Sequence, residues 1–317
     1  MRRDIVDAVP AVQAEGLTKR YGSTLAVDGL NLEIPAGQFF GLLGPNGSGK
    51  TSTIHMLSTL IRPSQGRAQI VGHDVRRAGL QVRAAIGVVF QESALDRTLS
   101  AAENLRFAGL LHNLPVAQIR ERSGELLELF GLKEKRNQAV GTLSGGQRRA
   151  LDIARGVIHR PQILFLDEPT IGLDVPNRRK IWRFIERLRA EFNVTVFLTT
   201  HYLEEAADCD KVAFIKQGRI VKIGPPHDLI DGLGAYIIEI ESENLRALVE
   251  SLTPRLGPSL IDGDKACFRF TGKDISPLVM LQIELGNKVI SMRWRRPNLN
   301  DVFLWINETE LWQVRKT

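Results

Sequence analysis

The sequence predicts an α/β fold over most of its 317 residues and a smaller α+β region after it. From about Val12 to Gly224, apolar runs alternate with amphipathic stretches, which is typical of an α/β domain. One apolar run, Phe39–Leu43, leads directly into a glycine-rich loop and then into a helical pattern. After Pro225-Pro226 the pattern changes to short strands and helices, so we expect a second domain there.

The apolar runs place the elements of the first domain. A helix is expected over Thr53–Ile61, after the glycine-rich loop, and Pro63 should end it. Between Glu92 and Arg160 the chain is predicted to be mostly helical. Besides Phe39–Leu43, we expect strands at Ile86–Phe90, Ile163–Leu166 and Val194–Leu198.

The second domain is predicted to have the order βαββαβ plus a final helix. Asn298 should cap that final helix, and Gly286 should close the helix before it. This order favours a split-βαβ domain of the ferredoxin-like kind. The expected elements are strands at Tyr236–Ile240 and Val289–Trp294, two short strands joined by a turn at Ile261–Asp264, and helices at Leu245–Leu252 and Ile275–Leu285.

Composition is that of a soluble globular protein, with 43% hydrophobic and 25% charged residues. No run of ~18 apolar residues occurs, so no membrane span is expected. The N-terminal residues Met1–Asp4 are charged and lack the apolar core of a signal peptide. Cys209 and Cys267 are too few and too far apart for a disulfide framework or a metal knuckle. We therefore expect the protein to reside in the reducing cytosol.

The formal net charge of +6 could indicate a nucleic-acid partner or an anionic membrane surface. The excess is dispersed, however, and its two dense clusters are not interleaved with runs of aromatic residues. We therefore expect no nucleic-acid partner. The clusters are Arg178-Arg179-Lys180 and Arg293, Arg295 and Arg296.

The glycine-rich loop after Phe39–Leu43 has the chemistry of a phosphate cradle. Its glycines let the backbone approach phosphates that a Cβ atom would exclude. Lys50 supplies a positive charge for the β- and γ-phosphates, and the Thr51 hydroxyl suits Mg²⁺. The alternative is a glycine loop that serves only as a turn, which the lysine and the flanking strand and helix disfavour. The loop, a Walker A motif, reads Gly44-Pro45-Asn46-Gly47-Ser48-Gly49-Lys50-Thr51-Ser52.

A second phosphate-binding sequence lies far downstream, at the start of an apolar-periodic helix. Free N–H groups and the positive end of the helix dipole suit such a helix start to a phosphate. Ser144 and Gln147 also match a capping box, so an ordinary capped helix is the alternative. One complete nucleotide site does not need two phosphate loops on one chain, whereas two chains sharing nucleotides do. The sequence is Leu143-Ser144-Gly145-Gly146-Gln147.

Two acids follow the predicted strand Ile163–Leu166. The strand should carry Asp167 to the sheet edge, where its carboxylate can hold Mg²⁺ directly or through water. Glu168 is then placed to act as the general base toward an attacking water. The alternative is a strand end with solvated charges, which the phosphate loop upstream makes the weaker interpretation.

These motifs and their order resemble the ATP-binding cassette (ABC) family over roughly Val12 to Gly224. The resemblance implies a P-loop NTPase cassette over residues 12–230, with a mixed-sheet core and a helical signature subdomain at about 92–160. Residues 231–317 would form the small α+β accessory domain. The cofactors implied are ATP and Mg²⁺.

The resemblance also assigns roles that spacing alone does not give. Gln91 matches the Q-loop residue that contacts Mg²⁺ or water, and His201 matches the switch histidine at the γ-phosphate. Asp174 matches the D-loop residue that reaches across the dimer, and Tyr21 matches the aromatic that stacks on adenine. The alternatives are a surface glutamine, a structural histidine and a core aromatic.

The function implied is ATP hydrolysis that energises a membrane exporter whose permease is a separate polypeptide. Two cassettes would form a homodimer head to tail, with Walker A of one facing Ser144 of the other. The permease would dock in the groove between the core and the segment Ala94–Leu114, at the cytoplasmic face of a prokaryotic inner (plasma) membrane. The run from Arg296 to Leu304 resembles the Pro-x-Leu-x-Asp-Val-Phe-Leu tail of drug-resistance and nodulation-factor export ATPases. A capped amphipathic helix is the alternative for that run.

Two other functions remain open at this point. A soluble ABC ATPase acting in DNA repair or on the ribosome would carry a coiled-coil insertion, a zinc insertion or a second cassette, and the sequence shows none of these. A degenerate cassette that only binds ATP is disfavoured by the intact Lys50, Glu168 and His201.

Overall fold

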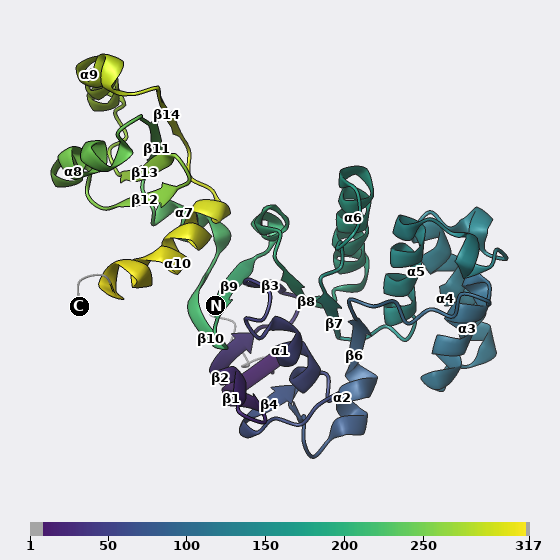
Figure 1. The fold of residues 1–317 in the computed structure, drawn as a ribbon. Helices are drawn as coiled ribbons and strands as arrows, with labels where there is room; N and C mark the ends of the chain where they lie inside the picture. Colours follow the sequence, from purple (N-terminus) through teal and green to yellow (C-terminus); the bar gives the residue numbers. More distant parts are fainter. Residues whose placement is uncertain (1–8, 315–317) are drawn as a thin grey trace, which may run out of the picture. The chain divides into compact units, whose positions relative to one another are not determined.

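A six-stranded sheet in the order β10-β9-β3-β8-β7-β6 organises the larger, N-terminal part of the chain (Figure 1). The pairs β9–β3, β3–β8, β8–β7 and β7–β6 are all parallel. Parallel strands carry their carboxyl ends to one edge, so the segments that follow β3, β6, β7 and β8 meet there. The strands are β3 (Phe39–Leu43), β6 (Ile86–Val89), β7 (Ile163–Asp167), β8 (Thr195–Thr200), β9 (Lys211–Lys216) and β10 (Arg219–Gly224).

The central strands of this sheet are buried on both faces. Every residue of β3, β7 and β8 is buried, which explains why these strands read as continuous apolar runs. The ring of Phe197 packs against those of Phe40 and Phe165, with centroids 5.3 Å and 5.4 Å apart. This packing fixes where the last residue of each strand lies at the carboxyl edge of the sheet.

A separate antiparallel sheet, in the order β2-β1-β4-β5, completes the core of the same part of the chain. Its strands alternate between buried and exposed residues along much of their length, as expected for a sheet with one solvated face. They are β1 (Val12–Tyr21), β2 (Thr24–Ile34), β4 (Gln65–Ile70) and β5 (His73–Asp74).

The helical stretch predicted between Glu92 and Arg160 is confirmed. The predicted bounds of the first helix are wrong: α1 begins at Lys50 and ends at Leu57. It begins there because Gly49, with φ +108°, ends the phosphate loop, and it ends before Thr59 because that residue has φ +65°. The helices are α1, α2 (Gly79–Ala85), α3 (Ala101–Leu111), α4 (Val116–Leu129), α5 (Gly145–Val157) and α6 (Val175–Phe192), with short 3-10 turns at Lys133–Lys135 and Val140–Thr142.

The predicted βαββαβ order after residue 230 is also confirmed. The four strands form an antiparallel sheet in the order β12-β13-β11-β14, which is the strand order of a split βαβ unit. Buried side chains of α8 and α9 share a core with this sheet. The elements are β11 (Tyr236–Glu241), α8 (Leu245–Leu256), β12 (Ser259–Asp262), β13 (Lys265–Phe270), α9 (Ser276–Leu285), a 3-10 turn at Gly286–Lys288, β14 (Ser291–Arg295) and α10 (Leu299–Val314).

The computed structural model describes residues 9–314, and the charged N-terminus Met1–Asp4 lies outside them. The chain divides into two compact units, the first running to His201 and resuming over Asp210–Val221. The second takes Tyr202–Cys209 and the chain from Lys222 onward, because the short helix α7 (Pro226–Asp231) and the 3-10 helix η3 (Leu203–Asp208) both contact α10. The division thus falls before residue 230, the predicted boundary of the cassette. Within residues 9–314, no helix combines the length and apolarity needed to cross a bilayer.

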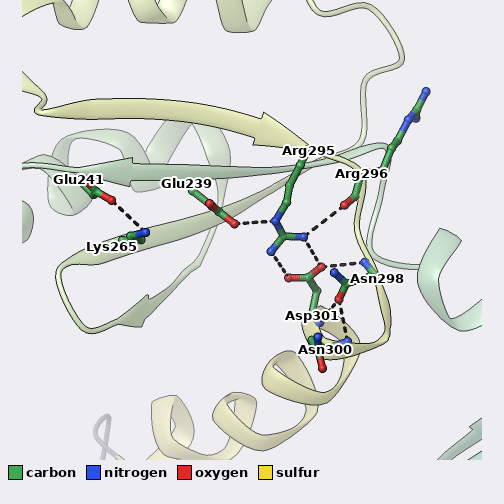
Figure 2. Close-up of polar contacts among 8 residues, drawn as sticks. All are labelled: Glu239, Glu241, Lys265, Arg295, Arg296, Asn298, Asn300 and Asp301. Carbon is green, nitrogen blue, oxygen red and sulfur yellow. Dashed lines mark hydrogen bonds and ion pairs between the residues drawn. The ribbon is translucent and has the colours of Figure 1, made fainter. Parts of the chain in front are cut away.

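The start of α10 is tied to the sheet of the second unit by a buried carboxylate (Figure 2). Asp301, 2% exposed, accepts hydrogen bonds from the Arg295 guanidinium at 2.7 Å and 2.8 Å and from the Asn298 N–H at 2.8 Å. Asn298 accepts in return from the N–H groups of Asn300 and Asp301, so it caps the helix as predicted. Arg295 also donates to Glu239 at 2.7 Å. The capped-helix interpretation of the Arg296–Leu304 run is therefore confirmed as its structural role.

Replacing Asp301 by Asn should lower the stability of the second unit by about 2 kcal/mol, because it removes the charge of a buried carboxylate that accepts from a partly exposed guanidinium. Hydrogen exchange of the β11 and β14 amides in the full-length protein measures this loss. Lys265→Ala, which breaks an exposed ion pair with Glu241 in the same sheet, should leave that exchange unchanged. Equal effects of the two variants would contradict the anchoring role of Asp301.

Candidate functional site

The phosphate loop lies between β3 and α1 and holds its lysine in place through its own carbonyls. Lys50 is 5% exposed, and its Nζ donates to the carbonyls of Gly44 at 2.9 Å and Pro45 at 3.1 Å. A Cβ atom on Gly44 would lie 2.3 Å from the carbonyl oxygen of Ile215, so only glycine fits at that position. The loop therefore presents a fixed ammonium group at the carboxyl edge of the sheet.

Asp167 ends β7 beside this loop and is held by two hydroxyl groups. Its Oδ1 accepts from Thr199 at 2.5 Å and from Thr51 at 3.4 Å, and the residue is 1% exposed. A carboxylate and a hydroxyl at this distance are oxygen ligands of the kind that Mg²⁺ prefers. The donor set of Thr51 and Asp167, with Gln91 on the neighbouring strand end, fits the predicted metal.

Glu168, the next residue, adopts a backbone conformation that is unusual for a residue with a side chain. Its φ is +47°, and its N–H donates to the carbonyl and the hydroxyl of Thr199, both at 3.1 Å. Its carboxylate lies between two nitrogen atoms: Lys50 Nζ at 3.5 Å and His201 Nδ1 at 3.2 Å. The three residues predicted to be catalytic are thus brought together by the ends of β3, β7 and β8.

A cavity of about 390 Å³ opens beside Glu168 and collects residues from distant parts of the sequence. Gln91 and Glu168 line it together with most of the phosphate loop, as the motif assignments require. Tyr21 does not line this cavity; it is exposed at the end of β1, with Lys19 Nζ 4.9 Å from the centre of its ring. The lining residues are Ala26, Asn46, Gly47, Gly49, Lys50, Thr51, Ser52, Gln91, Glu168 and Ile171.

The sequence Leu143–Gln147, predicted to bind phosphate, leads into α5 and lines a different cavity, of about 360 Å³. The Ser144 N–H donates to Gln147 Oε1 at 2.9 Å, and the Gln147 N–H donates to Ser144 Oγ at 3.3 Å, so the predicted capping box is present. Gly146 allows close packing, since a Cβ atom there would lie 2.7 Å from Asn177 Oδ1. Ser144 and Gly145 remain exposed. The two phosphate loops of one chain therefore do not share a cavity.

Asp174 has a local role that the D-loop resemblance did not predict. It is the N-cap of α6, and its carboxylate accepts from the backbone N–H of Asn177 at 2.8 Å and from the Asn177 side chain at 3.1 Å. In the described chain the carboxylate is thus engaged with its own helix. A role across a dimer stays a prediction.

Sequence reasoning missed two buried polar residues that support the site. Thr199 joins β8 to both acids, and its only signal was a hydroxyl two residues before His201 in an apolar strand. Arg149 of α5 is 8% exposed and donates to backbone carbonyls at the ends of β6 and β7. Its signal was a basic residue four positions before Ile153 on the apolar face of a helix.

Comparison with known proteins matches this geometry to one family. A family model described as ABC transporter matches residues 27–171, which contain the phosphate loop, Gln91, the signature sequence and the two acids. Daunorubicin/doxorubicin resistance ATP-binding protein DrrA of Streptomyces peucetius is 41% identical over 79% of this chain and 77% of its own length. Nod factor export ATP-binding protein I of Ralstonia nicotianae is 39% identical over 96% of each chain. The chain belongs to the ABC transporter family.

Solved structures agree with this assignment. The cbiO1 protein of Clostridium perfringens, described as part of an ABC transporter complex, has a TM-score of 0.66 and 26% identity over 78% of this chain and 96% of its own. A dimeric ATP-binding cassette bound to ADP and phosphate has a TM-score of 0.62 and 28% identity over 68% of this chain and 98% of its own. The chain is thus an ATP-hydrolysing subunit with the cassette fold. Relatives that are transporter subunits favour the exporter reading over a soluble repair or ribosomal ATPase.

Replacing Thr199 by Val should slow ATP hydrolysis on the order of tenfold, because one hydroxyl serves both Asp167 and the backbone of Glu168, and hydrogen bonds to charged groups contribute about 1.5–3 kcal/mol. Steady-state phosphate release measures the rate. Thr195→Val is the matched control on the same buried strand, where the hydroxyl accepts from the Gly37 N–H and contacts neither acid. A control variant as slow as Thr199→Val would show that the effect comes from the strand and not from the acids.

Proposed function

We propose that this chain hydrolyses ATP to drive export by a permease that is a separate polypeptide. The observation that carries the proposal is the position of Glu168, whose carboxylate lies between Lys50 and His201 beside the phosphate loop. The names of the relatives support the export direction, since the drug-resistance and Nod factor proteins share 39–41% identity with this chain. The exported molecule would be selected by the permease.

The chemistry follows from the order of groups around Glu168. ATP places its phosphates on the loop N–H groups and Lys50, and Tyr21 stacks on the adenine. The Glu168 carboxylate accepts a proton from water as the water oxygen bonds to the γ-phosphorus, and the bond from that phosphorus to the bridging oxygen of ADP breaks. His201 orients the water. Thr51, Asp167 and Gln91 would hold Mg²⁺, which would supply positive charge for the phosphate oxygens.

Two copies of the chain would complete each other's sites. In one chain the Ser144 loop lines a different cavity from Lys50, while Ser144 and Gly145 are exposed at a helix N-terminus. A head-to-tail homodimer brings these exposed N–H groups to the γ-phosphate bound by the second copy. Hydrolysis removes that bridging phosphate, so the two copies separate, and this opening is the mechanical output.

The permease would dock in a groove of the first unit with a volume of about 470 Å³. Its walls come from the core, through Leu60 and Val88, and from α3, through Ala108 and Leu111. This position agrees with the groove predicted beside Ala94–Leu114. Two arginines, Arg83 and Arg155, line it beside His112 and His159, and the charge of the arginines suits it to an apolar segment that carries a carboxylate. Docking there places the chain peripherally at the cytoplasmic face of the membrane.

Replacing Glu168 by Gln should leave ATP binding intact and slow hydrolysis by about 10²–10⁴-fold, because a positioned general base is lost. The variant should accumulate as an ATP-bound dimer in ATP and Mg²⁺. Phosphate release together with light scattering tests both expectations. Hydrolysis at the wild-type rate would remove Glu168 from the role of base.

Ser144→Arg should abolish hydrolysis while each monomer still binds ATP, because the added cation blocks the helix N-terminus that faces the partner's nucleotide. Mixing this variant with Lys50→Ala gives heterodimers with one intact composite site and one in which both loops are altered. We expect the mixture to hydrolyse ATP faster than either variant alone.

A mixture as inactive as its components admits two explanations, namely that the sites are not shared or that both must work. A nucleotide-dependent crosslink between chains at the Ser144 loop separates them. Crosslinking without hydrolysis indicates two interdependent shared sites, and its absence overturns the shared-site arrangement.

A further inference from the structure

One buried guanidinium joins the signature helix to the backbone around Glu168. Arg149 lies in the second turn of α5, and its guanidinium makes four hydrogen bonds to main-chain carbonyls. Nε donates to Pro169 at 2.7 Å, and Nη1 donates to Phe90 at 2.6 Å. Nη2 donates to Asp167 at 3.1 Å and to Glu168 at 3.2 Å. No step of the hydrolysis mechanism described above uses this residue.

The four carbonyls belong to the parts of the chain that carry the chemistry. Phe90 immediately precedes Gln91, and the other three carbonyls surround and include Glu168. Strands that stop at a sheet edge leave carbonyl groups that need partners, and arginine offers five donors in a rigid fork. One side chain therefore fixes the end of β6 and the end of β7 relative to each other.

Glu168 needs such support because its backbone is in the left-handed region, with φ +47°. A residue with a side chain is strained in that region, and the conformation persists only where the surroundings fix it. Thr199 holds the N–H of Glu168 from β8, and Arg149 holds its carbonyl from α5. The peptide groups on both sides of the carboxylate-bearing carbon are thus fixed.

The charge and the hydrogen-bond donors of Arg149 explain its presence at this buried position better than its side-chain volume does. Burial lowers the pKa of Arg149, and the nearby carboxylates of Asp152 and Asp167 act in the opposite direction. A buried charge is costly unless it is paired and hydrogen-bonded, and apolar residues of similar volume fill such positions with equal or better stability. We therefore attribute the arginine at this position of α5 to the hydrogen bonds that its guanidinium donates.

We propose that Arg149 is a positioning residue for ATP hydrolysis, which holds Glu168 in its working conformation and makes it move together with the signature helix. The proposal rests on the role of Glu168 as base in the proposed function. Its consequence for the dimer is specific, because α5 begins at Ser144. Arg149 therefore connects the Ser144 loop, which would contact the partner's nucleotide, to Glu168, which would act on the nucleotide bound by its own chain.

The test uses the full-length protein and the variants Arg149→Ala and Arg149→Lys. Arg149→Ala should lower kcat on the order of 10²-fold, the effect of a misplaced catalytic group, with KM for ATP changed by less than about twofold. Arg149→Lys should recover part of kcat, because an ammonium group keeps the charge and donates to some of the four carbonyls. Binding of a fluorescent ATP analogue should match wild type in both variants.

The matched control is Arg122→Ala. Arg122 is a half-buried arginine of α4 that donates at 3.1 Å to a single carbonyl, that of Ile158, at the other end of α5. Its loss removes a comparable helix contact outside the nucleotide site, so kcat should stay at the wild-type value. A wild-type kcat in Arg149→Ala, or equal losses in Arg149→Ala and the control, overturns the proposal.

A double variant with Glu168→Gln decides whether Arg149 acts through Glu168. If it does, adding Arg149→Ala to Glu168→Gln lowers the residual rate by less than about twofold. A further loss as large as that of the single variant overturns the proposal, as does a rise in KM with unchanged kcat. Should Arg149→Ala aggregate, Arg149→Lys carries the same comparison. Wild-type hydrolysis by Glu168→Gln alone would instead overturn the proposed base, and the single Arg149 variants still report on kcat.

Discussion

The parallel pairing of β3, β8, β7 and β6 is the constraint on which the rest of the site depends. Each of these strands ends at the same edge of the sheet, and each is followed by one chemical group: the phosphate loop after β3, His201 after β8, the two acids at the end of β7 and Gln91 after β6. Every residue of β3, β7 and β8 is buried, so the ends of these strands are held in fixed positions. Groups that are far apart in sequence therefore meet at this edge, where hydrogen bonds and ion pairs such as Thr199 to Asp167 and Lys50 to Glu168 join their segments.

Buried polar groups near that edge fix the relative positions of the side chains that the strands bring together. The Thr199 hydroxyl donates to Asp167 and accepts from the N–H of Glu168, so one oxygen atom helps to position both the proposed metal ligand and the proposed base. The guanidinium of Arg149 likewise holds the backbone carbonyls of Asp167 and Glu168, to which it donates hydrogen bonds. A buried donor or acceptor in this network that lost its partner would remain desolvated without a compensating hydrogen bond, which costs free energy. The network therefore holds the residues around Glu168 in one arrangement.

The second unit depends on a different interaction, the hydrogen bonds of a buried carboxylate. Its sheet is antiparallel, and its final helix is tied down by the buried Asp301, whose partners include a guanidinium and the N–H of its own cap. The pattern that resembles export ATPases in the sequence thus has a structural cause: Asp301 is the anchor, and Leu299 and Val302 are buried beside it. Arg295 of the basic cluster is engaged within the same network, so it does not contribute to a free basic surface.

The sequence by itself determined the features that depend on residues close together in the chain. The phosphate loop, the paired acids after an apolar strand and the Ser144–Gln147 capping box all act over a few residues, where spacing defines the geometry. The βαββαβ order was also readable, because alternation and helical periodicity are local signals.

Only the tertiary structure decided the contacts that join distant segments. It showed that Arg149 reaches the carbonyls of Asp167, Glu168 and Pro169 and the carbonyl of Phe90 beside Gln91. It also showed that a Cβ atom on Gly146 would collide with Asn177. It also moved the start of α1 to Lys50, since the left-handed Gly49 and not the apolar pattern sets where the helix begins. The physical reason is that local patterns report which face of an element is buried. The partner of a buried polar group is set by the packing of the whole sheet and its helices.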